Sequence, residues 1–176
     1  VKLAADKMIW LSRTANGAGI VVAATGLVPA RISTYAIETA IARYVRTSKI
    51  TDAEAVVYSS QGHTFYCLTF PSANATWVYD LSTGLWHERG VWDTSTGSYD
   101  FWGPRSHCYA FGKHIVGNRE DGILCDMDTE HTEECNGSLI RRLRIPPPLW
   151  LGPGRRMFVS RLQLLMQPGL GTSSGQ

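Results

Sequence analysis

The segment EAVVYSSQGHTFYCLTFPSANATWVYDLSTGLWHERG, residues 54–90, decides the fold class. It contains four runs rich in β-branched and aromatic residues, at 54–60, 63–70, 76–81 and 85–90. The links between these runs are QG, PSANA and STG. They are too short for a parallel return, which needs about a dozen residues. The segment therefore predicts a four-stranded antiparallel meander.

Most of the remaining sequence is also typical of strands. Short apolar runs bounded by Gly, Asn and other turn residues occur at 7–11, 19–24, 106–112, 113–118 and 123–128. The link REDG between the last two runs has the composition of a hairpin turn.

One segment breaks the strand pattern. In STYAIETAIARYVR, residues 33–46, apolar side chains recur at spacings of three and four, as on one face of a helix. Ser33 or Thr34 can cap its start, and Glu38 and Arg46 have the signs that the helix dipole favours. We expect one helix over 34–46 in an otherwise all-β chain.

An internal similarity suggests the architecture. WVYDLSTG (77–84) resembles ILCDMDTE (123–130), and Asp80 and Asp126 lie 46 residues apart in the numbering. Four-stranded propeller blades repeat about every 40–50 residues. We therefore expect part of a β-propeller, with Asp80, Gly84 and Asp126 at the repeated turn. Two or three blades cannot close a propeller, so the chain is expected to be a fragment of a longer protein.

The expected domain organisation has two parts. Residues 1–145 form propeller blades, with the helix at 34–46 as an insertion. Residues 146–176 begin with the rigid spacer PPP (146–148) and continue into a further strand, MFVSRLQLLM (157–166).

Charge is distributed unevenly along the 176 residues, although the net charge is only +2. Residues 135–176 contain no Asp or Glu, whereas residues 120–134 hold seven acidic residues and no Lys or Arg. A basic segment of this kind can contact either a neighbouring subunit or the phosphates of DNA. The residues proposed for such contacts are Arg141, Arg142, Arg144, Arg155 and Arg156.

The sequence shows no pattern typical of an enzyme or of a metal site. The five histidines have no metal-ligand spacing, and no nucleophile or nucleotide-binding motif is present. The four cysteines form no C-x-x-C pair, and free thiols are favoured over a disulfide. We expect no catalytic residues, no metal and no cofactor. No run is long and apolar enough to span a membrane, so no membrane partner is expected.

Aromatic residues are concentrated between positions 65 and 86. On strands such side chains pack across the sheet and between blades, which is the favoured interpretation. The expected structural core consists of Phe65, Tyr66, Phe70, Trp77, Tyr79 and Trp86. The alternative is a carbohydrate-binding or glycan-cleaving propeller of a phage tail or cell-surface protein, which would use Trp77, Trp86, Trp92 and Trp102.

Long strings of the sequence carry a family resemblance. YSSQGHTFYCLTFPSANATWVYDLSTGLWHERG (58–90), PARISTYAIETAIARY (29–44), CYAFGKHIVGNREDGILCDMD (108–128) and IRRLRI (140–145) resemble the tail hub, or packaged-DNA stabilization, proteins of short-tailed bacteriophages. Residues 91–104 lack the resemblance and are expected to form a variable loop.

The resemblance implies a structural protein of the virion tail, assembled in the host cytoplasm. Such hubs are β-propellers that form a ring, here expected as a homo-hexamer. The ring would extend the channel of the portal and adaptor proteins, retain the packaged double-stranded DNA by non-specific contact, and anchor tail spikes or a needle. The family has no catalytic residues to transfer to this sequence.

Overall fold

The computed structural model describes residues 1–17, 19–47, 50–119, 121–143, 145, 149, 152–161 and 163. The chain divides into a first unit, Val1–Arg142, and a second unit, Leu143–Gln176. The expected boundary between residues 145 and 146 stays a prediction. None of the described helical segments is long and apolar enough to cross a bilayer.

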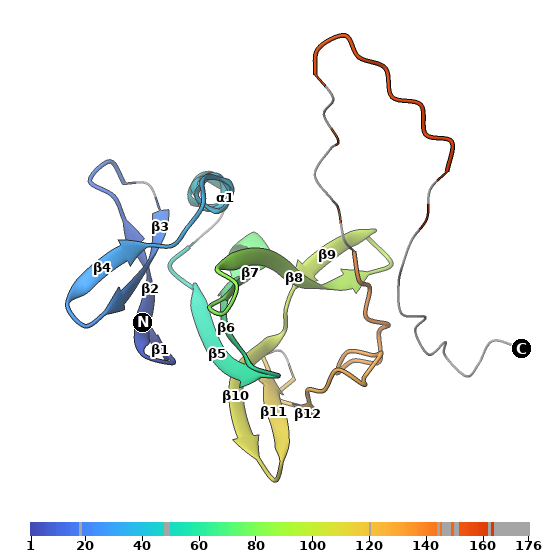
Figure 1. Cartoon of the computed structure of the whole chain (residues 1–176). Coiled ribbons are helices and arrows are strands. Elements are labelled where there is room, and N and C mark those ends of the chain that lie inside the picture. Colours follow the sequence, from blue (N-terminus) through green and yellow to red (C-terminus); the bar gives the residue numbers. More distant parts are fainter. Residues whose placement is uncertain are drawn as a thin grey trace, which may run out of the picture. The chain divides into compact units, whose positions relative to one another are not determined.

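The first unit contains three antiparallel sheets that follow one another along the chain (Figure 1). Within each sheet, every strand pairs with the next strand in sequence. The first sheet consists of β1 (Lys2–Ala4), β2 (Lys7–Arg13), β3 (Gly19–Thr25) and β4 (Val28–Arg31). The middle sheet consists of β5 (Glu54–Ser60), β6 (His63–Phe70), β7 (Ala75–Asp80), β8 (Leu85–Asp93) and β9 (Ser98–Phe101). The third sheet consists of β10 (Pro104–Ala110), β11 (Lys113–Asn118) and β12 (Leu124–Asp126).

A single α-helix, α1 (Tyr35–Thr47), links the first sheet to the middle sheet, and a short 3₁₀ turn, η1 (Pro71–Ala73), joins β6 to β7. These elements confirm the prediction of an all-β chain with one helix near 34–46. The buried face of α1 is the one that the spacing predicted: Ile37, Ala40, Ile41 and Tyr44. The helix approaches β3 so closely that a Cβ at Gly19 would lie 2.3 Å from Ile41 Cγ2. Glycine at position 19 is therefore required by the contact between helix and sheet.

The middle sheet has one strand more than the sequence predicted. The first half of β8 pairs with β7, and its second half, from Gly90 to Asp93, pairs with β9. The prediction of a variable loop over 91–104 is therefore wrong. The turn between β8 and β9 is DTSTG (93–97), which repeats the pattern DLSTG (80–84) between β7 and β8. This repeated turn pattern was the signal in the sequence for the hairpin of β8 and β9, which the prediction missed.

The three sheets share one strand register. Each opens with a hairpin whose loop has two residues, closed by the pairs Ala4↔Lys7, Ser60↔His63 and Ala110↔Lys113. The third residue after each loop, on the second strand, pairs with the third strand in all three sheets: Ile9↔Ala23, Phe65↔Asp80 and Ile115↔Asp126. Asp80 and Asp126 thus occupy equivalent positions, so the sequence similarity around them reflects a structural repeat.

The middle sheet is buried on both faces. One face packs with α1 and the first sheet in a large apolar cluster: Ala4, Ile9, Val21, Ala23, Ile37, Ala40, Ile41, Tyr44, Tyr66, Leu68, Phe70 and Ala75. The other face carries a smaller cluster formed by Tyr58, Cys67, Val78 and Trp102, against which Phe65 and Met127 pack. The first strands β1, β5 and β10 lie next to one another. Consecutive blades of a β-propeller have this arrangement, with their first strands gathered on one side.

The expected aromatic core residues all lie on the middle sheet. Tyr66 and Phe70 are fully buried, and Trp77, Tyr79 and Trp86 pack against the larger cluster from partly buried positions. Phe65 points to the opposite face and joins the smaller cluster. Burial raises the pKa of the neighbouring Cys67 thiol to about 11, so this cysteine is uncharged and unreactive in the folded chain.

Two sequence-based expectations are wrong. A disulfide links Cys125 to Cys135, whereas Cys67 and Cys108 are free thiols. The expectation of free thiols therefore holds only for Cys67 and Cys108. The chain reverses between the two bonded cysteines and brings their Cα atoms to 5.9 Å, and their spacing in sequence does not reveal that reversal. The expected strand at 157–166 is absent over 157–161 and 163, the part of that segment that the structure describes, where no partner strand is present.

Candidate functional site

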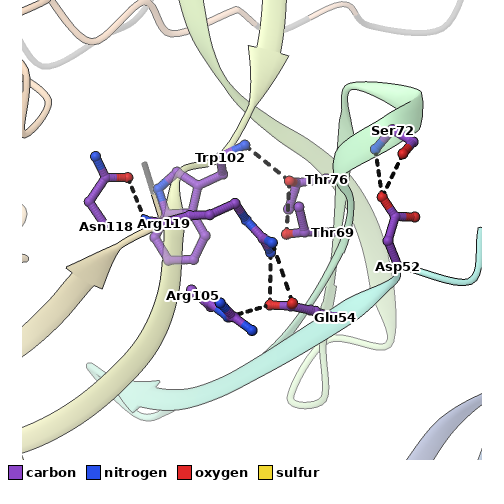
Figure 2. Close-up of polar contacts among 9 residues, drawn as sticks. All are labelled: Asp52, Glu54, Thr69, Ser72, Thr76, Trp102, Arg105, Asn118 and Arg119. Atoms are coloured by element: carbon purple, nitrogen blue, oxygen red, sulfur yellow. Dashed lines mark hydrogen bonds and ion pairs between the residues drawn. The ribbon is translucent and has the colours of Figure 1, made fainter. Parts of the chain in front are cut away.

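Charged side chains meet at the junction between the middle and third sheets. The Glu54 carboxylate at the start of β5 accepts hydrogen bonds from Arg119, with Nη2–Oε2 at 2.8 Å and Nη1–Oε1 at 3.3 Å. Arg105 Nε on β10 lies 3.0 Å from the same Oε2 atom. Figure 2 shows both guanidinium groups pointing to this one carboxylate. A carboxylate shared by two arginines forms a network, which holds its geometry better than an isolated surface ion pair.

Hydroxyl groups extend this junction into the middle sheet. Thr69 Oγ1 and Thr76 Oγ1 are buried and 3.0 Å apart, and Thr76 Oγ1 accepts the backbone N–H of Trp102 at 3.0 Å (Figure 2). This bond ties the segment between β9 and β10 to the centre of the middle sheet. It also fixes the place of Trp102, whose side chain is only 6% exposed.

Asp52 anchors the chain just before β5. Its Oδ2 accepts two hydrogen bonds from Ser72, from the backbone N–H at 2.9 Å and from Oγ at 2.7 Å (Figure 2). Burial alone would raise the pKa of the Asp52 carboxyl, but these hydrogen bonds outweigh it and lower the pKa. Among the described residues, Asp52 Oδ1 and Arg119 Nε are buried without a hydrogen-bond partner.

Arg89 on β8 lies inside the smaller cluster. Its guanidinium carbon is 4.9 Å from the ring centre of Trp102, 5.7 Å from that of Tyr58 and 5.9 Å from that of Phe65. Nη1 donates a hydrogen bond of 2.6 Å to the Tyr58 hydroxyl. Burial raises the pKa of Tyr58, and Arg89 partly counteracts that rise. The sequence analysis did not identify Arg89. Its position in a strand region rich in aromatic residues could have indicated a contact between its guanidinium group and aromatic rings.

Two histidines face Tyr58 from the third sheet. His107 Nε2 and His114 Nδ1 are 2.9 Å apart, and their ring centres lie 5.6 and 6.2 Å from that of Tyr58. Burial, with a smaller contribution from His114, lowers the pKa of His107. Two protonated imidazoles cannot share this hydrogen bond, because both ring nitrogens would then be donors.

The predicted turn residues Asp80 and Gly84 form a turn that the Asp80 carboxylate organises. Asp80 Oδ1 accepts the Ser82 N–H and Oδ2 accepts the Thr83 hydroxyl, each at 2.9 Å, while the Gly84 N–H bonds to the Asp80 carbonyl at 2.8 Å. His63 Nδ1 lies 2.8 Å from Oδ2. Burial would raise the pKa of Asp80, but these hydrogen bonds together lower it.

The same turn is built a second time at Asp93, which bonds Ser95 and Thr96 in the same way. The third predicted turn residue, Asp126, has a different partner, because its Oδ2 accepts Lys113 Nζ at 2.7 Å.

The predicted contact arginines have different surroundings. The Arg141 guanidinium carbon lies 3.8 Å from the ring centre of Trp92 and 5.9 Å from that of Tyr99, so Arg141 packs on the β8–β9 hairpin. Arg142 is exposed in the first unit, and Arg155 and Arg156 are exposed in the second. Arg144 lies outside the described residues. Arg142, Arg155 and Arg156 are therefore the described candidates available to a partner.

The four tryptophans proposed for sugar binding are engaged within the first unit. Trp77 Nε1 donates to the Tyr44 hydroxyl at 3.2 Å, and Trp86 Nε1 donates to the Ile32 carbonyl at 2.9 Å. Trp92 stacks with Arg141, and Trp102 is buried. The alternative carbohydrate-binding function thus loses the exposed aromatic surface on which it depends.

The polar and aromatic contacts described above can hold the middle and third sheets together. Within the described ranges, no three His, Cys, Asp or Glu side chains converge in a way that could hold a metal ion. The charged and aromatic groups at the junction bond to one another across β5, β8, β10 and β11. They connect the middle sheet to the third sheet.

Comparison with known proteins agrees with this geometry. A family model described as Bacteriophage P22 Gp10, beta-propeller matches residues 2–132, about three quarters of the chain. The match confirms the prediction of a partial β-propeller. A search of curated proteins finds no match.

Proposed function

The chain belongs to the phage stabilisation family of β-propellers, and on this basis we propose that it is the tail hub of a short-tailed phage. Family membership makes it a structural component of a phage virion that stabilises packaged DNA. The proposed finer role is to extend the channel of the portal and adaptor proteins, to retain the DNA and to anchor tail spikes or a needle.

One observation supports this role above the others. The middle sheet is buried on both faces and is joined to the third sheet by the network of Glu54, Arg105 and Arg119. A protein that continues a channel and retains DNA needs modules whose sheets are held together in this way. The charged and aromatic groups described above connect strands of different sheets, which supports a structural role.

The proposed assembly is a ring of copies, expected as a hexamer, formed in the host cytoplasm and incorporated in the virion tail. Residues 1–145 would supply its propeller blades, and residues 146–176 would supply a spacer and a contact segment. The exposed Arg155 and Arg156 would meet DNA phosphates or an acidic neighbour.

A binding experiment tests the hub role. The full chain is mixed with purified portal–adaptor complexes of a short-tailed phage, sedimented, and examined by negative-stain electron microscopy. The expected result is additional density on the channel axis below the adaptor. Complexes without added density at saturating concentrations would contradict the proposal.

A second experiment tests the contact with DNA. Fluorescence anisotropy measures the affinity of the chain for a short DNA duplex over a series of salt concentrations. The double variant Arg155→Glu/Arg156→Glu should bind more weakly, with a salt slope smaller by about 2, because each lost phosphate contact removes about 0.9 from the slope. The double variant Arg43→Glu/Arg46→Glu on exposed positions of α1 makes the same change in net charge and is the control. Equal weakening by both pairs would show that net charge alone governs binding.

A further inference from the structure

Histidines gather where the middle sheet meets the third sheet. Four of the five histidines in the sequence lie there: His63 on β6, His87 on β8, His107 on β10 and His114 on β11. His63 and His87 flank Phe65, with ring centres 5.8 and 6.4 Å from that of Phe65. The other two contact Tyr58, whose ring centre is 5.1 Å from that of Phe65. Imidazole groups from four strands of two sheets therefore surround two neighbouring aromatic rings.

A permanent positive charge lies in the same place. The guanidinium carbon of Arg89 is 5.7 Å from the centre of the Tyr58 ring, and His107 approaches that ring to 5.6 Å. The hydrogen bond between His107 and His114 needs one ring nitrogen without a proton, so the pair keeps it only while one imidazole is neutral. The other ring that packs on His114 is that of Tyr109, at 4.9 Å. A second proton on the pair would break its hydrogen bond and add a like charge close to Arg89.

The carboxylates at this contact compensate added positive charge only in part. Asp80 already accepts hydrogen bonds from its turn and lies 2.8 Å from His63. Glu54 is already shared by two arginines. Glu134, in the segment after β12, is half-buried, and Arg89 is close enough to lower the pKa of its carboxyl against the larger effect of burial.

The sign of the pH dependence follows from these surroundings. Burial, and then Arg89, lowers the pKa of His87, whereas burial, and then His114, lowers that of His107. Opening the contact therefore takes up protons at both imidazoles, and their contribution to the closed state is lost as the pH falls below about 6.5. Glu134 acts in the opposite direction, because burial raises the pKa of its carboxyl and its protonation favours closure. Two imidazoles against one carboxyl leave a net uptake of about one proton on opening.

We propose that the contact between the middle and third sheets is an acid-sensitive junction. Below about pH 6.5, protonation of its histidines beside Arg89 separates the third sheet locally from the middle sheet. The large apolar cluster on the opposite face of the middle sheet stays closed, because none of the described residues that form it is a histidine. The proposal rests on these side chains and not on the proposed hub role.

A buried thiol can report the opening. Cys67 is 1% exposed and belongs to the smaller cluster, on the face of the middle sheet that meets the third sheet. Cys108 is exposed, and Cys125 and Cys135 are bonded to each other. The substitution Cys108→Ser therefore leaves Cys67 as the only free thiol in the chain. Dithiodipyridine, a disulfide reagent that reacts with thiols in acid as well as at neutral pH, labels Cys67 only when its cover opens.

The labelling rate of the full Cys108→Ser chain between about pH 7.5 and 5 tests the proposal. Each rate is divided by the rate of the same chain unfolded in urea at the same pH, which removes the effect of pH on the thiol itself. The ratio should rise about tenfold from pH 6.5 to 5.5, because about one proton is taken up on opening. Adding His107→Gln should reduce the rise to less than about threefold. His131→Gln, at an exposed position after β12, is the matched control and should leave the rise unchanged.

Three outcomes would overturn the junction. The first is a ratio that stays constant or falls in acid. The second is an equal effect of His107→Gln and His131→Gln, which would assign the response to histidine charge in general. The third is a loss of far-ultraviolet circular dichroism over the same pH range as the labelling, which would show global unfolding. If His107→Gln does not fold at neutral pH, His114→Gln takes its place, since its amide can still donate to His107, and a rise as large as that of the parent would likewise overturn the proposal.

Discussion

Replacing Arg89 by methionine removes a positive charge from the aromatic cluster between the middle and third sheets. Methionine keeps most of the volume and the apolar stem but cannot donate to the Tyr58 hydroxyl, which now lies 2.6 Å from Arg89 Nη1. It also loses the attraction between the guanidinium and the rings of Tyr58, Phe65 and Trp102. The change therefore tests whether this contact stabilises the packing of the two sheets.

The expected loss of stability follows from three terms. A hydrogen bond to a charged group contributes about 1.5–3 kcal/mol, and a partly desolvated cation–π contact contributes about 1–2 kcal/mol. Removing a half-buried charge regains part of its desolvation cost. The net destabilisation is expected to be about 2 kcal/mol.

Urea unfolding followed by tryptophan fluorescence measures this change. With a urea dependence of about 2 kcal/mol/M, the midpoint should fall by about 1 M. The cycle of Arg89→Met with Tyr58→Phe isolates the pair, and a coupling free energy of about 1 kcal/mol or more is expected because the two side chains are in contact. Arg13→Met, at an exposed position at the end of β2, is the control and should change stability by less than about 0.5 kcal/mol.

Three results would refute the reasoning. If Arg89→Met unfolded at the wild-type midpoint, the guanidinium would contribute nothing to the junction between the sheets. If its effect simply added to that of Tyr58→Phe, the loss would come from general packing and not from the hydrogen bond. A fall in the midpoint of the Arg13 control as large as that of Arg89→Met would show that the effect belongs to net charge.

Three further predictions concern the backbone, pH and redox state. Gly90→Ala should lower the free energy of unfolding by more than about 2 kcal/mol in urea titrations, because the new Cβ would lie 2.3 Å from a carbonyl oxygen of β9. His107 has a lowered pKa in the folded chain, so folding releases protons from it: its contribution to stability is complete above about pH 6.5 and is lost as the pH falls below that value. A pH series of urea midpoints from 8 down to 5 should be flatter for His107→Gln, and identical slopes would contradict this. Thiol titration in denaturant should find two reactive cysteines without reductant and four with it, whereas four in both conditions would exclude the bond between Cys125 and Cys135.

The amino-acid sequence determined the local elements of this protein. Links of two to five residues between apolar runs left only antiparallel neighbours, so the order of the first four strands of the middle sheet followed directly from 54–90. The spacing of Ile37, Ala40, Ile41 and Tyr44 likewise fixed the buried face of α1. The similarity around Asp80 and Asp126 revealed the repeat, because equivalent positions in two sheets carry the same local constraint.

Local patterns also had definite limits. β9 was missed because the run Ser98–Phe101 has only four residues, and its pairing depends on the second half of β8. The disulfide was missed because nothing in the spacing of Cys125 and Cys135 shows that the chain turns back between them.

Only the tertiary structure decided how the sheets meet. Glu54 and Arg119 lie 65 residues apart in sequence, and Arg89 lies 31 residues from Tyr58, yet each pair is in hydrogen-bond contact. Whether such residues meet depends on which face of each sheet turns to its neighbour and on the register of the strands between them. A local sequence pattern specifies the periodicity of one strand, whereas the stacking of sheets is fixed by the burial of all their apolar faces together.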